Sequence, residues 1–393
     1  MYWLIIPVAV YSIGILGLWL IVRGRRDDAR PAAGGTTKVT VVVAARNEAG
    51  NIEPLLESLA RQDYPHDLLE IIIVNDNSTD RTPIIVSGFI ERNRQQSGLS
   101  IRLIYNPFSG KKRAIGYGIE KASGELILTT DADCIVGPGW VSAHAAAFAA
   151  VGKSGHAADS EPQGGNEHAE VGATGSADLV LGEVYQGPPK GFVALFGMFE
   201  FSALQSVTEA AVLAGHPVMC NAANLSFRRE VYLRHAGELK GDLPSGDDMF
   251  LLHAVKRGGG NIRHAGSRAA AVETASAVKA AALLRQRARW ASKTFYYSDT
   301  ATLTLAAATA ACNAAVTAAA VASVISVTHL PLLAALYGLR LVPDYLIIAR
   351  NIKKRGEKLP LAAFILSELI YPFYFMTVAV ISLFPSSRRF SRG

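Results

Sequence analysis

The sequence has few cysteines and few charges. Cys134, Cys220 and Cys312 are the three cysteines in 393 residues, and none belongs to a CxxC pair. A disulfide framework and a thiolate zinc site are therefore excluded, and the usage fits a reducing compartment. Charged residues make up 18% and hydrophobic residues 50%, whereas soluble domains carry about a quarter charged residues. This imbalance predicts membrane-spanning segments.

The first 22 residues contain no charged side chain, and Arg23, Arg25 and Arg26 follow them directly. A secretory leader would carry its positive charges before the apolar run, so a leader is not expected. The run is long enough to cross a bilayer. We expect an uncleaved anchor at residues 1–22 with its N-terminus outside, then a linker at 23–37 in the cytosol.

The C-terminal part of the chain, residues 301–384, is apolar again and predicts two or three spans. Its least certain stretch, residues 330–349, contains Arg340 and Asp344. These residues lie four apart on one helical face, so they could pair and make a third span tolerable. Three spans would leave a basic tail at 385–393 outside, against the positive-inside rule, so one helix could instead lie in the interface.

Between these apolar ends, β-branched runs alternate with amphipathic stretches. This alternation predicts an α/β fold with a doubly wound, mostly parallel sheet, and a ligand beyond the carboxyl ends of the strands. Residues 151–178 are rich in Gly, Ala, Ser and acids, and we expect them to form a flexible insertion. A single strand is expected at 179–187. The other expected strands are 38–46, 69–76, 101–105 and 124–130, and the helices between them 51–62, 81–95 and 111–123.

Several of the expected strands end in polar side chains. Asp131 and Asp133 follow the fourth strand as a D-x-D pair, and Glu48 and Asp76 follow the first two. Side chains on a strand repeat with a period of two, so both acids of the pair should project to one side. Such hard oxygen ligands suit Mg²⁺ or Mn²⁺. A solvated turn is the alternative, but buried carboxylates are costly unless they are paired or metal-bound.

Basic residues lie near these acids. The formal net charge is +6 and the pI about 9.2, which is compatible with nucleic acid, anionic lipid or phosphorylated substrates. Lys111 and Lys112 follow Gly110 and open an expected helix, whose N-terminus would attract a diphosphate. The alternative is an ordinary basic turn. Asp76 could accept hydrogen bonds from a base or ribose, or simply form an Asx turn.

Asp247 and Asp248 stand at the start of an apolar helix. One interpretation is N-terminal capping of that helix. The other is that one acid serves as a general base. Adjacent residues point to different faces of a helix, so only one acid is needed for capping.

Gln286, Arg289 and Trp290 lie at i, i+3 and i+4 of an expected amphipathic interface helix at residues 276–295. An amide, a cation and an indole together suit a sugar ring beside a phosphate. The alternative is a helix that lies on the membrane surface. This alternative rests on three basic residues of the same stretch, which stands just before an apolar span: Arg285, Arg287 and Lys293.

Taken in order, these motifs resemble the membrane-bound inverting glycosyltransferases of the family-2 type. This family includes the cellulose, chitin and hyaluronan synthases and related bacterial polysaccharide and glycolipid enzymes. The likeness covers about residues 38–295. It rests on the segments VVVAARNE, VNDNSTD, GKKRAIGYGIEKASGE, TDADC, NAANLSFRRE, SGDDMFL and QRARW.

The resemblance implies a GT-A nucleotide-diphospho-sugar transferase fold and a role for each motif. Asp248 would be the catalytic base with Asp247 supporting it, and Asp131 and Asp133 would hold Mg²⁺ or Mn²⁺. The acceptor and the diphosphate would be bound by Gln286, Arg289, Trp290 and Asn224. The nucleotide-sugar, a UDP-sugar by resemblance, would be bound by Ala45, Glu48, Asp76, Lys111, Lys112 and Asp131.

We therefore expect a metal-dependent inverting glycosyltransferase in the cell (inner) membrane, multi-pass, with a cytosolic catalytic domain at 38–295. Its acceptor would be a polysaccharide or another glycan. We also expect contact with membrane lipids, and the sequence is compatible with a partner subunit. A nucleic-acid partner is not expected. Single-sugar transfer to a lipid is the alternative, and a non-catalytic scaffold a weaker one. An NAD-dependent oxidoreductase is disfavoured because no GxGxxG follows the first strand.

Overall fold

The computed structural model of the chain describes residues 1–25, 36–94, 98–149, 175–239, 243, 246–277 and 279–384. The predicted linker at 23–37 and the predicted insertion at 151–178 lie mostly outside the described residues. The basic tail at 385–393 lies wholly outside them.

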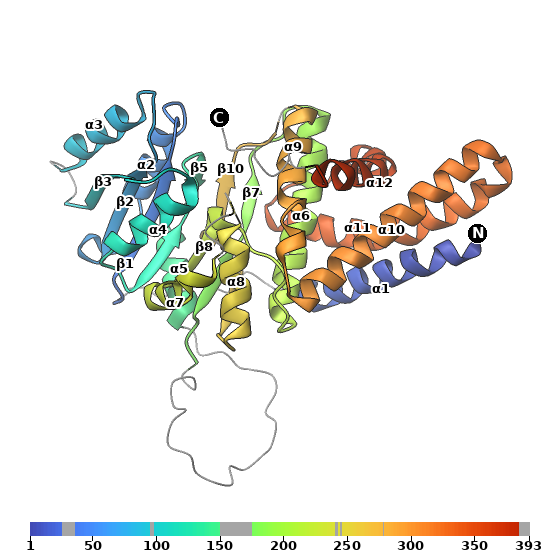
Figure 1. Cartoon of the computed structure of the whole chain (residues 1–393), viewed down its shortest axis with the longest axis horizontal. Helices are drawn as coiled ribbons and strands as arrows, with labels where there is room; N and C mark the ends of the chain where they lie inside the picture. The colour runs from blue at the N-terminus through green and yellow to red at the C-terminus, as the bar shows by residue number, and fades with distance from the viewer. Residues whose placement is uncertain are drawn as a thin grey trace, which may run out of the picture.

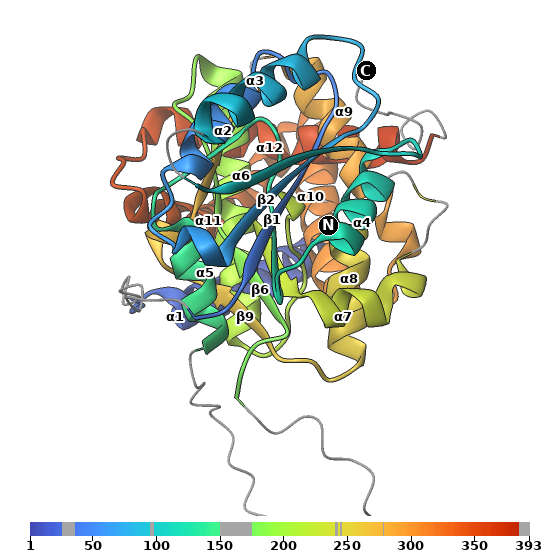
Figure 2. The ribbon, with the colours of Figure 1, turned by 90° about the vertical axis from the view of Figure 1, so that its left-hand side faces the viewer.

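A seven-stranded sheet forms the centre of the α/β part of the molecule, between the N-terminal and C-terminal apolar helices. Its strands are β1 (Val39–Ala45), β2 (Leu69–Asn75), β3 (Ser100–Tyr105), β4 (Leu126–Thr129), β6 (Leu179–Gly182), β8 (Leu225–Arg228) and β9 (Ile262–Ala265). The order is β3-β2-β1-β4-β8-β6-β9, and only β8 runs antiparallel to its neighbours. The doubly wound, mostly parallel sheet that the alternation predicts is confirmed (Figure 2).

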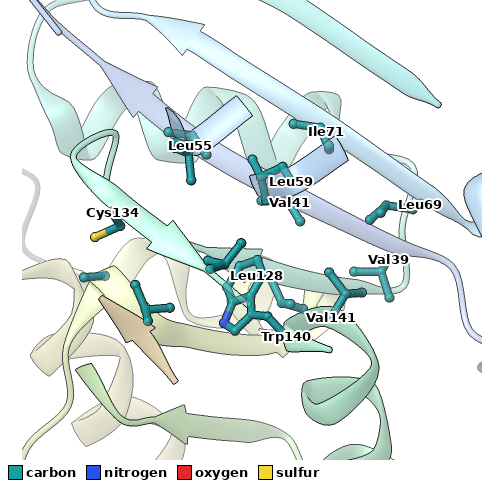
Figure 3. Close-up of a cluster of buried hydrophobic side chains, with 14 of the residues drawn as sticks. Val39, Val41, Leu55, Leu59, Leu69, Ile71, Leu128, Cys134, Trp140 and Val141 are labelled. Atoms are coloured by element: carbon teal, nitrogen blue, oxygen red, sulfur yellow. The ribbon is translucent and has the colours of Figure 1, made fainter. Parts of the chain in front are cut away.

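Helices cover both faces of this sheet. One face carries α2 (Ile52–Ala60), α3 (Thr82–Arg94) and α5 (Trp140–Ala149), and the other carries α4 (Lys111–Lys121), α7 (Arg229–His235) and α8 (Asp247–Arg257). Alternate residues of β1 serve the two faces: Val41 packs with Leu55 and Leu59 (Figure 3), whereas Val42 packs against α4. α4 lies so close that a Cβ at Gly118 would stand 2.5 Å from Val42 Cγ1.

The parallel strands β1, β2 and β3 end level with one another, and β4 ends opposite Val42 of β1. β1 and β2 pair in register from Val39 with Leu69 to Ala45 with Asn75, and β4 pairs with β1 as far as Thr129. The residues that follow these strands are therefore delivered to one edge of the sheet.

A second, three-stranded sheet lies beside this edge in the order β5-β10-β7. Its strands are β5 (Cys134–Val136), β7 (Val184–Gln186) and β10 (Val272–Thr274). The single strand expected at 179–187 is wrong, because β6 and β7 belong to different sheets and Glu183 between them is fully buried. Periodicity could not reveal this break, since the stretch stays buried across it.

The remaining long helices are α1 (Ile5–Val22), α6 (Phe192–Leu213), α9 (Ala280–Ala291), α10 (Thr300–Ile325), α11 (Leu330–Lys354) and α12 (Leu361–Ser382). Four helical segments of the described chain are long and apolar enough to cross a membrane: Tyr2–Val22, Thr300–Ile325, Val327–Lys354 and Leu361–Ser382. The predicted pair in α11 is present, with Arg340 3.1 Å from Asp344. Three helices, not two, thus follow residue 300.

The four apolar helices do not share one direction. In Figure 1, α1, α10 and α11 extend away from the sheets, whereas α12 is strongly foreshortened beside α6 and α9. Figure 2, turned by 90°, shows α12 lengthwise behind the sheet. α12 therefore lies across the other three helices, at the junction between them and the sheets.

The C-terminal end of α11 is fixed to the α/β part by ion pairs. Arg350 lies 2.7 Å from Glu209 of α6, and Lys354 lies 2.8 Å from Glu183 between β6 and β7. Both glutamates are buried. The basic end of α11 thus binds α6 and the segment that joins the two sheets.

Candidate active site

A cavity of about 1000 Å³ opens at the carboxyl ends of β1, β2 and β4 and continues past α8 and α9. It brings together residues that the sequence analysis selected one motif at a time. Every predicted site residue except Asn224 lines it: Ala45, Glu48, Asp76, Lys111, Lys112, Asp131, Asp133, Asp247, Asp248, Gln286, Arg289 and Trp290.

Asp76 follows β2 directly and is buried, at 3% exposure. Its carboxylate accepts hydrogen bonds from Asn106 Nδ2 at 2.8 Å and from the backbone N–H of Gly110 at 3.0 Å. A carboxylate has about four acceptor positions, so capacity remains for a ligand in the cavity. Asp76 thus also holds the loop that leads into α4 and its lysines.

The other polar residues after β1 and β2 bind one another. Asn47 accepts a hydrogen bond from the backbone N–H of Thr79 at 2.8 Å, and its own N–H donates to Ser78 Oγ at 3.1 Å. Asp80 accepts from the N–H of Thr82 at 2.9 Å at the start of α3. These hydrogen bonds join the loop after β1 to the loop after β2, so the side chains stabilise the edge of the cavity.

Asp131 and Asp133 lie in the turn that joins β4 to β5, not on the strand. The strand-alternation argument is therefore wrong for them, although both side chains line the cavity. The turn is closed by a hydrogen bond from the N–H of Cys134 to the carbonyl of Asp131 at 3.1 Å. Cys134 itself is buried, and burial raises the pKa of its thiol to about 12.

The two acids fit a divalent cation by their chemistry. Both present carboxylate oxygens, which Mg²⁺ and Mn²⁺ prefer, on the wall of a cavity with room for a phosphate-bearing ligand. Lys111 Nζ contacts Asp131 and would share it. Asp133 forms no ion pair within the described residues. Because three such donors do not cluster in the described part of the chain, a cation here would take further ligands from substrate or water.

Asp248 stands in the first turn of α8 and is half-buried at the cavity wall. Its carboxylate accepts hydrogen bonds from the N–H of Met249 at 2.9 Å and of Ala222 at 3.2 Å. Burial, and next the charge of Asp247, raise the pKa of Asp248, whereas the cation of Lys293 opposes the rise. Lys293 also lines the cavity, and burial lowers the pKa of its ammonium group.

α9 places Gln286, Arg289 and Trp290 on the cavity wall, as the helical spacing predicts. Arg287 also lines the cavity, but its side chain is buried, pairs with Glu200 of α6 at 2.8 Å, and lies 4.3 Å from the centre of the Trp290 ring. The surface-helix interpretation is wrong for Arg287, which is buried and paired, whereas Lys293 is half-buried and lines the cavity. Arg287 instead fixes the indole.

Asn224 is the predicted site residue that the structure places elsewhere. It is fully buried, and its Nδ2 donates to the carbonyls of Glu183 at 2.6 Å and Ala270 at 2.7 Å. Its Oδ1 accepts from Trp140 Nε1 at 2.9 Å. The amide is fully used in joining β8 to its surroundings, so it has no capacity left for an acceptor.

Two cavity residues were missed by the sequence analysis as site residues. Asn221, three positions before Asn224, lines the cavity, but its amide is one of several in that loop and nothing in the sequence distinguishes it. Lys293 had a signal: it stands three residues after Trp290 and so continues the face of Gln286, Arg289 and Trp290.

Comparison with known proteins agrees with this arrangement. Residues 40–173 match the family model described as glycosyl transferase family 2. The matched residues include β1, β2 and β4, whose carboxyl ends border the cavity.

Two curated proteins align with this part of the chain. The probable glycosyltransferase YdaM of Bacillus subtilis (strain 168) is 40% identical over 96 residues, which is 24% of this chain and 23% of that protein. The beta-monoglucosyldiacylglycerol synthase of Nostoc sp. (strain PCC 7120) is 31% identical over 125 residues, 32% of this chain and 26% of that protein. The alignments thus span about a quarter of the length of these relatives.

A solved structure matches nearly the whole chain. The mannosyltransferase PcManGT from Pyrobaculum calidifontis, in complex with GDP-Man and Mn²⁺, superposes with a TM-score of 0.56 and 19% sequence identity. The match covers 96% of this chain and 99% of that one. The chain therefore has the GT-A fold of glycosyltransferase structures.

Proposed function

We propose that this chain is an inverting glycosyltransferase that moves a sugar from a nucleotide-diphospho-sugar to an acceptor at a membrane. One observation carries the proposal. A single cavity joins the polar strand ends of the GT-A sheet, the carboxylate of Asp248 and the cavity-facing side of α9. These are the groups needed to bind a nucleotide-sugar, to accept a proton and to hold an acceptor.

The donor would lie along the edge formed by β1, β2 and β4. Asp76 would accept hydrogen bonds from the nucleoside, and Lys111 and Lys112 at the N-terminus of α4 would attract the diphosphate. Arg289 from α9 adds a further cation to this wall. Glu48 and Ala45 also line the cavity and would lie beside the nucleobase of the donor.

The reaction would be a direct displacement at the anomeric carbon. An acceptor hydroxyl forms the new C–O bond while the bond to the diphosphate breaks, and Asp248 takes the hydroxyl proton. Its raised pKa, caused by burial and by Asp247, supports this assignment because a better proton acceptor is a stronger general base. Asp247 and Lys293 would tune that basicity from either side.

Asp131 and Asp133 would hold Mg²⁺ or Mn²⁺. A divalent cation there supplies positive charge opposite the departing diphosphate. The Mn²⁺ in the structure of PcManGT, which shares the fold, supports a cation in this chain.

The catalytic part would face the cytosol at the cell (inner) membrane, with α1, α10 and α11 as spans. We assign α12 to the membrane interface, because it lies across these three helices beside α9. This placement leaves the end of α12 on the cytosolic side. It thereby removes the conflict between three C-terminal spans and the positive-inside rule.

The acceptor class has two candidates. Gln286, Arg289 and Trp290 form a wall that suits a sugar ring, which favours a glycan or polysaccharide. The name of the Nostoc relative favours a lipid. A non-catalytic scaffold is the third possibility, and turnover alone would exclude it.

The test is release of nucleoside diphosphate by the full chain in nanodiscs, with a panel of nucleotide-sugars and Mn²⁺ or Mg²⁺. We expect one sugar to bind by calorimetry and to turn over, and chelation of the metal to stop turnover. Failure of every donor to bind with metal present would contradict the proposal.

A further inference from the structure

The cavity does not end at α9 but continues among the apolar helices. Beyond Trp290 its wall is formed by side chains of α1, α10, α11 and α12. The apolar side chains of this extension, called the apolar branch below, are Ile15, Leu305, Ala306, Ile347, Phe375 and Val378. Polar side chains of the same helices line it as well, among them Tyr11, Thr302, Thr309, Asp344 and Tyr371. The residues that would bind the donor and the apolar side chains of these helices thus line one continuous cavity.

The apolar branch enters the helices but does not cross them. On α10 its lining residues run from Thr302 to Thr309, whereas the helix continues to Ile325. At 1.5 Å per residue the branch follows α10 for roughly 10 Å, against about 30 Å for the hydrocarbon core of a bilayer.

A buried charge cluster closes the far end of the branch. Arg340 of α11 donates to Asn313 Oδ1 of α10 at 3.1 Å and pairs with Glu368 of α12 at 3.0 Å. Beyond it, Val8, Val316 and Leu336 are fully buried against one another. The branch is therefore a closed pocket and not a channel.

The closed end of the branch favours one of the two acceptor classes. A growing polysaccharide would need a path through the membrane and partners for its many hydroxyls, because an unpaired hydroxyl in an apolar site costs about 1–3 kcal/mol. A hydrocarbon chain needs neither. It requires only an apolar pocket that opens from the cytosolic leaflet beside the reacting groups.

We propose that the apolar branch holds the hydrocarbon chain of a membrane lipid, whose head group carries the acceptor oxygen to Asp248. This inference rests on the proposed function for its chemistry. The head-group oxygen bonds to the anomeric carbon, the sugar–diphosphate bond breaks, and the nucleoside diphosphate leaves with the electron pair. A hydroxyl proton, where the head group has one, passes to Asp248.

The test fills the branch and leaves the donor side untouched. Ala306 lines the branch, whereas its neighbour Ala307 is exposed on the outer side of α10. Ala306→Trp should therefore exclude the lipid chain, and Ala307→Trp is the matched control. Ala306→Phe provides a smaller filling side chain in case the tryptophan prevents folding.

Binding is measured without any donor, using full-length protein in nanodiscs. Diacylglycerol and a polyprenyl phosphate, each with a photoactivatable group on the hydrocarbon, are cross-linked and the labelled peptides identified. We expect labels on α10 and α12 in the wild type and in Ala307→Trp, with at least a tenfold loss in Ala306→Trp. The lipid that labels the branch distinguishes an alcohol head group from a phosphate.

Transfer is then measured with the same variants. We expect Ala306→Trp to lower lipid glycosylation at least tenfold while donor affinity, measured by calorimetry, is unchanged. Equal cross-linking in Ala306→Trp and Ala307→Trp, or transfer to a soluble glycan but not to either lipid, would overturn the inference. Absence of donor binding in the wild type would instead contradict the proposed function, with the cross-linking result still deciding the lipid site.

Discussion

Two groups of charged side chains in this molecule have the same members, two carboxylates and one cation, yet differ in burial and in pairing. The first group lies among the apolar helices. Arg340 is 3.1 Å from Asp344 and 3.0 Å from Glu368, and it also donates to Asn313. The cation touches both acids, and Asp344, which lies at the closed end of the cavity, also accepts a hydrogen bond from Tyr11 at 2.8 Å.

The second group lies on the wall of the cavity. Asp247, Asp248 and Lys293 all line open space, and Lys293 forms no ion pair within the described residues. Backbone N–H groups hold Asp248, and no cation of the described residues forms an ion pair with it, so its pKa is raised by burial and by Asp247. The folded chain thus keeps one carboxylate in a state that favours proton uptake.

The difference separates structure from chemistry. A buried charge that is fully paired stabilises an arrangement of helices, and removing one member leaves the others uncompensated. A buried charge that faces a cavity costs stability and is available to a substrate. The following variants test whether the two groups divide in this way.

The largest effect is expected for Asp133→Ala, which removes an acid of the cavity that no cation pairs with in the described chain. Turnover should fall at least about 100-fold, because a metal ion at a phosphoryl oxygen contributes several kcal/mol. Turnover is measured as a function of Mn²⁺ concentration. The exposed Asp67→Ala is the control, and full turnover of Asp133→Ala at low Mn²⁺ would remove this acid from the site.

Arg340→Met should cause the largest loss of stability. It leaves Asp344 and Glu368 buried without their cation, at a cost of about 3–5 kcal/mol. Thermal unfolding in nanodiscs measures this effect, with the exposed Arg234→Met as the control. An unchanged unfolding temperature would mean that the Arg340–Asp344–Glu368 cluster does not stabilise the fold.

A smaller loss of stability is expected for Gly182→Ala, which tests the hydrogen-bonded amide of Asn224. The new Cβ would stand 2.2 Å from Asn224 Nδ2 and displace an amide that has no alternative partners. Overpacking of this kind costs about 1–3 kcal/mol. Gly88→Ala, where no atom lies within 4 Å, is the matched control. Equal unfolding temperatures for the two variants would contradict the structural role of Asn224.

The subtlest change is expected for Lys293→Met. Asp248 must be ionised to accept a proton, and the cation of Lys293 lowers the pKa of that carboxyl. Removing the cation raises the pKa of Asp248, so the acidic limb of the kcat/KM profile should move to higher pH. The exposed Lys279→Met should leave the limb in place. An unmoved limb in Lys293→Met would separate Lys293 from the base.

The sequence was sufficient to find which segments meet at the site. Asp76, Asp131 and Asp248 were selected from their places after strands and at a helix start, and such places follow from local pattern. The α/β alternation predicted the parallel sheet that brings two of them together. The Arg340–Asp344 pair followed from helical spacing alone.

What the sequence could not supply is tertiary context. Asn224 looks like any loop amide until its four neighbours are known, and these come from α5, from Glu183 between β6 and β7, and from the segment before β10. Glu368 joins Arg340 across two helices, and Arg287 turns away from solvent because Glu200 lies opposite it. The transverse course of α12 likewise cannot be read from its composition, which is that of a span.

The most direct test of this account compares donor binding and turnover in Asp248→Asn. Because the pKa of Asp248 is raised in the folded chain, its ionisation at neutral pH costs stability, and asparagine removes that cost. The account predicts an unfolding temperature at or above wild type, unchanged nucleotide-sugar affinity, and nucleoside diphosphate release reduced about 100- to 10,000-fold. Release at the wild-type rate by the folded, donor-bound variant would contradict it.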